Sequence, residues 1–254
     1  FQKVRKIRRK GKNKLLLIFP KGTSTVLLKV GMSAVDQTGA RKNVEKEIPH
    51  WGFNQLRAEV TKKWDKELDR IQFQSRDRDA MITFYSALYH SFLAPNLFSD
   101  VDGRYRGRDN QVHQLAEDEG KNYTVFSLWD TYRATHPLYT LIQQDRTMDF
   151  LNTFERQFDQ GGDLPVWELA GNETECMIGY HSVSVIADAF VKGLGRTSDR
   201  KIDHTKFLEM MVATSNFDEF GKKSFGRRGF IDMGNEPESV SKTLEYAYDD
   251  FCIA

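Results

Sequence analysis

Residues 161–168 place a carboxyl group between apolar neighbours, at the end of a helical pattern. Gly161 and Gly162 end that pattern, and Pro165 stiffens the chain ahead of Glu168. Trp167 precedes Glu168, and apolar surroundings disfavour the charged form of a carboxyl, so its pKa should rise. A glutamic acid that stays protonated near neutral pH can act as a general acid. Taken alone, the segment favours the simpler interpretation of a surface glutamate with a chance tryptophan neighbour.

A second segment pairs an aromatic ring with a carboxylate at the end of an apolar run. Trp129 offers an apolar face on which a sugar ring can lie, and Asp130 can accept hydrogen bonds from neighbouring hydroxyl groups. The pair therefore suits the floor of a saccharide site. Asp130 also fits the N-cap of the next helix, with Trp129 in the core, and local sequence favours the cap.

Two further acidic segments could supply oxygen ligands. Residues 100–105 resemble the start of a calcium loop but lack the closing glutamate of an EF-hand, so we predict a tight turn there. Residues 235–239 carry amide and carboxylate oxygens, including Glu238, just before an apolar helical stripe. These groups suit either a hard cation or the N-terminal cap of that helix.

Several other chemistries are disfavoured. The six histidines lack the spacing of a zinc helix, and neither a Gly-x-Ser-x-Gly elbow nor a phosphate-binding glycine loop occurs. A formal net charge of +1 gives no long-range field for nucleic acid. The basic residues 4–12 lack interleaved aromatics, so we expect a solvated strand or a poorly defined terminus there. No apolar run is long enough to span a membrane. Cys176 and Cys252 are expected to be small buried side chains.

The pattern changes along the chain from strand to helix. Residues 15–19 and 25–30 are short β-prone runs around a turn-like segment, and we predict that they form a hairpin. From residue 40 apolar side chains recur every three or four residues, which predicts helices with core-facing stripes. Those stripes are Met81, Phe84, Tyr85, Leu88 and Phe92; Phe150, Phe154 and Phe158; Val183, Ile186, Ala187 and Phe190; Phe207, Leu208 and Met211; and Val240, Leu244 and Ala247. Residues 1–36 are expected to end a β-domain, residues 37–75 to form a helical linker broken at 49–52, and residues 76–254 to form a helical domain.

Four strings carry a family resemblance, in the same order as in the family. They are residues 94–107 (Ala-Pro-Asn-Leu-Phe-Ser-Asp-Val-Asp-Gly-Arg-Tyr-Arg-Gly), 126–131 (Phe-Ser-Leu-Trp-Asp-Thr), 167–174 (Trp-Glu-Leu-Ala-Gly-Asn-Glu-Thr) and 238–250 (Glu-Ser-Val-Ser-Lys-Thr-Leu-Glu-Tyr-Ala-Tyr-Asp-Asp). Together they resemble glycoside hydrolase family 92, over about residues 26–254. The chain begins at Phe1 and ends within a helical pattern, so we expect it to be part of a longer protein.

The resemblance implies a mainly α fold, part of an (α/α)6 toroid preceded by the end of a β-sandwich domain. It implies a secreted, periplasmic or cell-surface α-mannosidase that removes terminal mannose from glycans, including N-glycans, with inversion and with Ca²⁺ as cofactor. By position, Glu168 would be the general acid and Glu238 a carboxylate near the calcium. Trp129, Asp130, Trp167, Asn172 and Glu173 would line the mannose pocket, and the general base would lie beyond residue 254.

Two other interpretations stay open. Another glycosidase or a phosphorylase on the same helical toroid could use the same tryptophan, aspartate and glutamate. A non-catalytic carbohydrate-binding relative would need the sugar floor but not the acid. The resemblance favours the mannosidase over both.

Overall fold

The computed structural model describes residues 6–9, 11, 14–196 and 202–254. The helices are α1 (Gln37–Glu47), α2 (Phe53–Leu68), α3 (Arg78–Ser91), α4 (Leu128–Thr131), α5 (Thr135–Ile142), α6 (Gln144–Gly161), α7 (Ser182–Val191), α8 (His204–Asn216), α9 (Lys222–Arg228) and α10 (Ser239–Ile253). The strands are β1 (Lys6–Arg9), β2 (Leu15–Ile18), β3 (Asn96–Leu97), β4 (Arg104–Arg106), β5 (Val112–Gln114), β6 (Tyr123–Thr124), β7 (Phe126–Ser127), β8 (Trp167–Leu169) and β9 (Asn172–Glu173). The described part of the chain is therefore mainly helical, as the sequence predicts.

The chain has an N-terminal hairpin, but the prediction that residues 25–30 form its second strand is wrong. β2 pairs antiparallel with β1, with Lys6 opposite Ile18, whereas residues 25–30 form no strand. The predicted turn at residues 20–23 exists and is closed by the Thr23 N–H donating to the Pro20 carbonyl at 3.2 Å. Residues 6–9 of the basic run thus form a strand, and they pair with β2 in place of residues 25–30.

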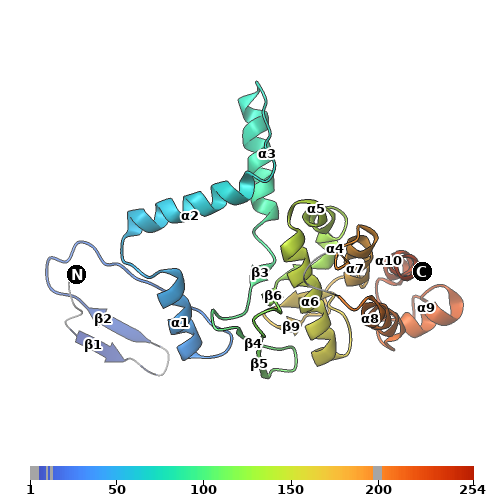
Figure 1. Cartoon of the computed structure of the whole chain (residues 1–254). Coiled ribbons are helices and arrows are strands. Elements are labelled where there is room, and N and C mark those ends of the chain that lie inside the picture. Colours follow the sequence, from blue (N-terminus) through green and yellow to red (C-terminus); the bar gives the residue numbers. More distant parts are fainter. Residues whose placement is uncertain (1–5, 10, 12–13, 197–201) are drawn as a thin grey trace.

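Helices α2 and α3 form an arm that stands away from the rest of the molecule, whereas α1 lies beside β4 and β5 (Figure 1). α1 and α2 are separated at residues 48–52, which agrees with the predicted break. Asp36 caps α1 by accepting from the Gly39 N–H at 2.7 Å, and Asp77 caps α3 in the same way. α2 has no buried residue, and Leu88 is the single buried residue of α3. Most of the predicted α3 stripe is therefore only partly covered.

Polar contacts hold α1 against the β4–β5 hairpin. Arg104 of β4 donates to Asp36 at 2.9 Å, and Asn43 of α1 donates to Asp100 at 2.7 Å. Gly39 is the single buried residue of α1, and a Cβ there would lie 2.1 Å from Asp100 Oδ2. The close approach of helix and hairpin therefore requires a glycine.

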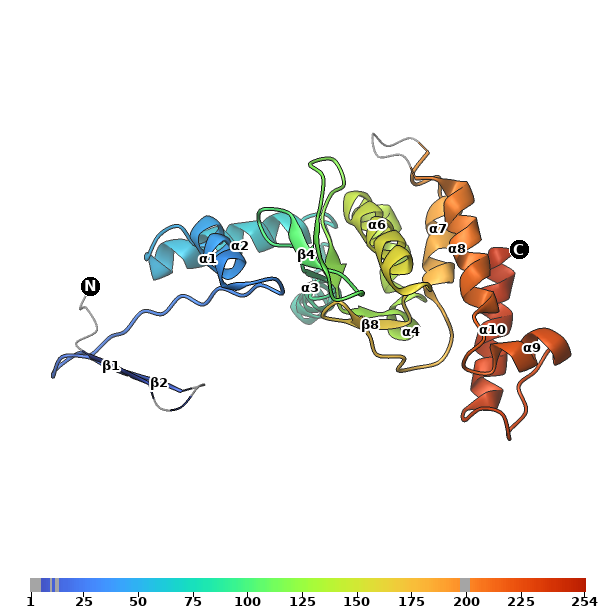
Figure 2. The same cartoon turned by 90° about the horizontal axis from the view of Figure 1, so that it is seen from below.

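The core lies where α5, α6, α7 and α8 pack beside one another, with α10 against α7 and α8 (Figure 2). Its fully buried side chains come from these helices and from the strand and loops between them: Phe126, Leu151, Phe154, Leu164, Ile186, Phe207 and Met210. The apolar stripes of α6 and α7 were predicted correctly, because both helices bury one face. Leu208 of α8 departs from its stripe, with 48% of its surface exposed.

The predicted stripe of α10 is wrong. Val240 and Leu244 are 74% and 68% exposed. The helix instead buries Lys242, Tyr246 and Asp249, which lie on its other face. Asp249 binds Tyr180 and His181, which directly precede α7, and this pairing sets which side of α10 faces inward.

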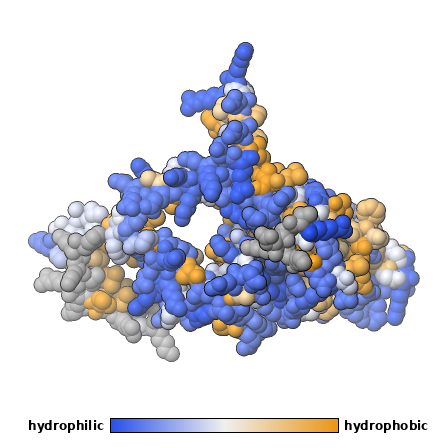
Figure 3. Space-filling view, in the orientation of Figure 1, coloured by the Kyte–Doolittle hydropathy of each residue, from blue (hydrophilic) through white to orange (hydrophobic). Residues whose placement is uncertain are grey.

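Hydrophobic residues gather along α3 where the arm meets the body (Figure 3). In the described part of the chain, no helix combines the length and apolar character needed to cross a membrane. Cys176 is exposed and Cys252 half-buried, so the expectation that both cysteines are buried is wrong.

Candidate active site

The three-stranded sheet β7–β8–β9 gathers the segment that carries Glu168. Phe126 of β7 lies opposite Glu168 of β8, and Glu168 lies opposite Glu173 of β9. Ala170 and Gly171 connect β8 to β9 with φ values of 53° and 82°. Two central residues with positive φ are typical of the tight hairpin turns that suit strand twist. The turn therefore sets both glutamates on one small sheet.

The Glu168 carboxyl is buried and receives three hydrogen bonds. Only 1% of the residue is exposed. Its Oε1 accepts from the Thr124 hydroxyl at 2.8 Å and from the Gly171 N–H at 2.5 Å, and its Oε2 accepts from the Val125 N–H at 3.0 Å. The side chain is thus held in one orientation by donors from two separate parts of the chain.

Burial raises the pKa of Glu168 to about 7, even though the hydrogen bonds from Gly171, Thr124 and Val125 each act to lower it. The neighbouring negative charge of Glu173 raises it further. A carboxyl with this pKa is protonated in a large fraction of molecules at neutral pH and can also lose its proton. These are the properties of a general acid or base that works near pH 7.

A cavity of about 990 Å³ lies next to this carboxyl. Thr124, Val125 and Ala170, which surround Glu168, form part of its wall, and α1 and the preceding segment form the opposite side. Figure 3 shows an opening framed by α1, α2 and the strands. Asp100, 5% exposed, also lines the cavity and receives hydrogen bonds from Ser33 and Asn43. The predicted turn after Asp100 is present, closed by the Gly103 N–H at 2.9 Å.

The other residues predicted for the sugar site lie on the same sheet or directly after it. Glu173 accepts from four backbone N–H groups, those of residues 166, 167, 174 and 175, at 2.8–2.9 Å. Trp167 is half-buried, and Asn172 is exposed with its amide 3.4 Å from the Ala170 carbonyl. The Glu173 carboxylate is thus held by four backbone donors, whereas Glu168 is more deeply buried and is held by three donors.

Trp129 and Asp130 lie in α4, which follows β7 directly. Asp130 is inside the helix and accepts from the Ser127 hydroxyl, and Ser127 occupies the N-cap position. The interpretation of Asp130 as the N-cap is therefore wrong. Trp129 is half-buried, so its assignment to the core is wrong too. Its indole N–H donates to Glu245 of α10 at 3.2 Å.

Sequence reasoning missed a second polar cluster around Glu245. Besides Trp129, Glu245 accepts from the Tyr132 hydroxyl at 3.3 Å and from Arg133 at 3.1 Å. Its Oε2 lies 3.3 Å from Nε2 of the buried His181, although this approach lacks hydrogen-bond geometry. A cavity of about 470 Å³ adjoins Tyr132, Arg133 and Glu245. The four-residue spacing of Glu245 and Asp249 on α10 was the signal for this cluster.

His181 is held between α4 and α10. Asp249 accepts from His181 Nδ1 at 2.8 Å and from the Tyr180 N–H at 2.7 Å. The Tyr132 ring stacks on His181 with centroids 4.0 Å apart. Burial raises the pKa of Asp249, and burial followed by the charge of Glu245 raises that of Tyr132 to about 12. The cluster joins α4, α7 and α10 through buried polar groups.

Glu238 does not form a metal site with its present neighbours. Its side chain is 65% exposed, and Lys242 Nζ lies 4.0 Å from its Oε2. It occupies the N-cap position of α10 with φ of 60°, and its side chain makes no capping hydrogen bond. Across residues 6–9, 11, 14–196 and 202–254, no three histidine, cysteine, aspartate or glutamate side chains are grouped to hold a metal ion. Calcium takes six to eight oxygen ligands, and the carboxylates of the described residues are not grouped to supply them.

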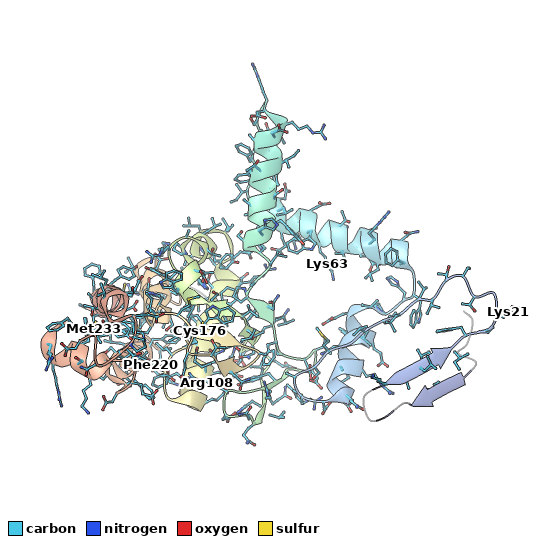
Figure 4. The ribbon with its side chains drawn as sticks, turned by 180° about the vertical axis from the view of Figure 1, so that it is seen from behind. Lys21, Lys63, Arg108, Cys176, Phe220 and Met233 are labelled. Atoms are coloured by element: carbon cyan, nitrogen blue, oxygen red, sulfur yellow. The ribbon has the colours of Figure 1, made fainter. Side chains whose placement is uncertain are left out.

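The β9–α7 loop carries Cys176, and Arg108 lies toward the end of α6 (Figure 4). Arg108 donates to the Asp163 carbonyl at 2.8 Å and pairs with the Asp163 carboxylate at 2.7 Å. These contacts fix the segment between α6 and β8, and so support the strand that carries Glu168.

Comparison with known proteins gives consistent matches. The glycosyl hydrolase family 92 catalytic domain matches residues 39–254. A family GH92 α-mannosidase from Bacteroides thetaiotaomicron is 43% identical, with a TM-score of 0.81, over 87% of this chain and 29% of that protein. A second structure of the same protein contains mannoimidazole. A family GH92 inverting mannosidase from the same organism is 29% identical with a TM-score of 0.78, over 87% of this chain and 30% of that protein.

A curated relative extends the comparison beyond bacteria. An uncharacterized secreted glycosidase from Arthroderma benhamiae is 26% identical over 252 residues, covering 91% of this chain and 28% of the relative. The chain therefore spans less than a third of the length of the proteins that it matches.

Proposed function

Because the chain belongs to glycosyl hydrolase family 92, we propose that it forms part of a secreted, calcium-dependent exo-acting α-mannosidase. The proposed substrate is a terminal α-linked mannose on an oligosaccharide or a glycoprotein glycan. The similarity to an α-mannosidase that was solved with mannoimidazole, and to an inverting mannosidase, supports this substrate class. The similarity to a protein described as a secreted glycosidase supports the location.

The proposed general acid is Glu168. The burial of its carboxyl beside a cavity carries this proposal. Glu168 is 1% exposed and its pKa is about 7. Thr124, Val125 and Ala170, which surround it, line a cavity of about 990 Å³. A protonated carboxyl can give its proton to the glycosidic oxygen as the bond to the sugar breaks. The departing sugar then leaves as an alcohol rather than as an alkoxide, which lowers the barrier.

The proposed mannose floor consists of Trp129, Asp130, Trp167, Asn172 and Glu173. Trp129 and Trp167 offer apolar faces, and both are half-buried rather than enclosed in the core. Asn172 is exposed and can exchange its weak contact at 3.4 Å for a sugar hydroxyl. Glu173 lies opposite Glu168 in the sheet register, so a sugar held there would be close to the proposed acid.

An inverting reaction also needs a general base across the sugar from the acid. The two carboxyl groups of such enzymes lie about 6.5–9.5 Å apart, with the attacking water between them. We propose that the base comes from a part of the longer enzyme outside these 254 residues. The 254-residue chain by itself is then expected to be inactive.

Calcium is proposed for the longer enzyme, with Glu238 as one ligand. Its exposed carboxylate could bind a cation if it gave up its contact with Lys242 Nζ, which lies 4.0 Å away. The other oxygen ligands would have to come from elsewhere. Loss of mannose release in EGTA, restored by added Ca²⁺ and not by Mg²⁺, is the expected result.

The stereochemical course tests the proposed activity. The full-length protein should release mannose from an α-linked mannobiose, with β-mannose as the first anomer in proton NMR spectra. Glu168→Gln should lower the rate about 10²- to 10⁴-fold, the usual contribution of a general acid. Mannose binding without turnover by the full-length protein would instead indicate a carbohydrate-binding relative. Release of glucose but not of mannose would indicate another toroid glycosidase.

A further inference from the structure

Thr124 connects the Glu168 carboxyl to the turn that follows it. The threonine hydroxyl donates to Glu168 Oε1 at 2.8 Å and accepts from the Ala170 N–H at 2.7 Å. Thr124 is 6% exposed, so water does not readily replace either bond. One hydroxyl therefore bridges β6, the carboxyl on β8 and the β8–β9 turn.

The backbone on both sides of the carboxyl is strained. Val125 has φ of 68°, a conformation that is costly for a β-branched residue, and Ala170 has φ of 53°. Such positions cost about 1–3 kcal/mol each and persist where surrounding contacts determine them. The strained Val125 presents its N–H to Glu168 Oε2, and the strained Ala170 presents its N–H to the Thr124 hydroxyl. Both strained residues therefore take part in the hydrogen bonds that surround the Glu168 carboxyl.

We propose that Thr124 is a positioning residue that fixes the direction of the Glu168 carboxyl and adjusts how readily it gives up its proton. This inference rests on the proposed role of Glu168 as the general acid. Thr124 also lines the cavity of about 990 Å³ beside the carboxyl, together with Val125 and Ala170.

Charged side chains and backbone donors other than Thr124 also lie near the Glu168 carboxyl. Glu173 faces Glu168 from β9 and disfavours its charged form. Arg106 of β4 binds the Ala170 carbonyl at 2.6 Å, on the turn beside the carboxyl. Gly171 and Val125 donate through their backbone, which side-chain substitution leaves in place. Thr124 is the side-chain hydroxyl among the donors to Glu168, so it can be removed without removing the other two.

The direction of the effect follows from the hydrogen bond. Because the Thr124 hydroxyl donates to the carboxyl, it favours the charged form and lowers the pKa of Glu168. Two or three such donors can lower a carboxyl pKa by about two, so one donor accounts for about one pH unit. Thr124→Val keeps the shape of the side chain and removes the donor. The high-pH limb of kcat/KM, where the acid loses its proton, should therefore move up by about one pH unit.

The experiment compares pH profiles of kcat/KM for an unactivated α-mannobiose in the full-length protein. Thr124→Val should raise the high-pH limb, and Thr124→Ser, which restores the hydroxyl, should return it to the wild-type position. Thr147→Val is the matched control, since Thr147 is also buried but donates to the carbonyl of Gln143, which precedes α6. It should leave the limb in place. Glu168→Gln should remove the limb.

Different results would contradict the positioning role of Thr124 and the general-acid role of Glu168 on which it rests. If Glu168→Gln keeps the limb at the wild-type pH, another group is the acid and the proposed function of Glu168 fails. If Glu168→Gln removes the limb but Thr124→Val leaves it unmoved or lowers it, the inference about Thr124 alone is overturned. A limb raised equally by Thr124→Ser, Thr124→Val and Thr147→Val would mean a general loss of packing and would also overturn it.

Discussion

Replacing Glu168 by glutamine should change how stability depends on pH. The pKa of this carboxyl rises from its usual 4.5 to about 7 in the folded protein, chiefly because of burial. A group whose pKa is raised by folding contributes stability that is complete below about pH 4.5 and is lost as the pH passes about 7. Glutamine is neutral throughout, so Glu168→Gln should abolish this loss.

The size of the effect follows from the difference between the two pKa values. One pKa unit corresponds to about 1.4 kcal/mol, and a rise from 4.5 to about 7 therefore corresponds to about 3 kcal/mol. At low pH the substitution should itself cost about 1–3 kcal/mol, because the new amide NH₂ must face a backbone donor or the Thr124 hydroxyl. The variant should thus be less stable than the wild type at acid pH and comparable or more stable above neutral pH.

Urea unfolding followed by tryptophan fluorescence, at several pH values between about 4.5 and 8.5, measures this difference. Other buried groups with shifted pKa values, such as Lys222, titrate in both proteins and cancel in the subtraction. Glu209→Gln, at an exposed position of α8, is the matched control for the change from carboxyl to amide. A Glu168→Gln difference that stays constant across this range would refute a raised pKa for Glu168.

Two further predictions concern the packing around the site. Gly39→Ala should weaken the attachment of α1, because its Cβ would lie 2.1 Å from Asp100 Oδ2, and hydrogen exchange of residues 37–47 should accelerate. The control Gly226→Ala, inside α9 with open space around its Cβ, should leave that exchange unchanged and stabilise by about 0.5–1 kcal/mol. Asp249→Ala should cost about 3–5 kcal/mol in urea unfolding, since it removes the buried partner of His181, and a cost below about 1 kcal/mol would contradict this.

Helix positions were largely predictable from the spacing of apolar residues, and their burial was not. Phe154 and Ile186 lie on stripes that the fold buries completely. Leu244 lies on an equally regular stripe yet is 68% exposed, because Asp249 on the opposite face of α10 binds His181 and Tyr180. A stripe shows that one face can be buried, whereas polar contacts with distant residues decide which face is buried here.

The candidate site was only partly visible in the sequence for a similar reason. Trp167 and Leu169 indicate an apolar surrounding for Glu168, but the three hydrogen bonds to it come from Thr124, Val125 and Gly171. Thr124 and Val125 are more than 40 positions away, and only the pairing of β7 with β8 brings them close. Strand pairing also explains the wrong hairpin, since a β-prone run does not specify its partner.

We propose that Glu168, rather than Glu173 on the paired strand β9, donates the proton to the leaving group. The most direct test compares two α-mannosides in full-length Glu168→Gln and Glu173→Gln variants. One carries a 2,4-dinitrophenolate leaving group, which needs no proton, and the other an unactivated sugar. Glu168→Gln should lose about 10²- to 10⁴-fold of kcat/KM on the unactivated sugar and little on the activated mannoside, whereas Glu173→Gln should affect both alike. If Glu173→Gln instead loses kcat/KM on the unactivated sugar and little on the activated mannoside, Glu173 rather than Glu168 donates the proton.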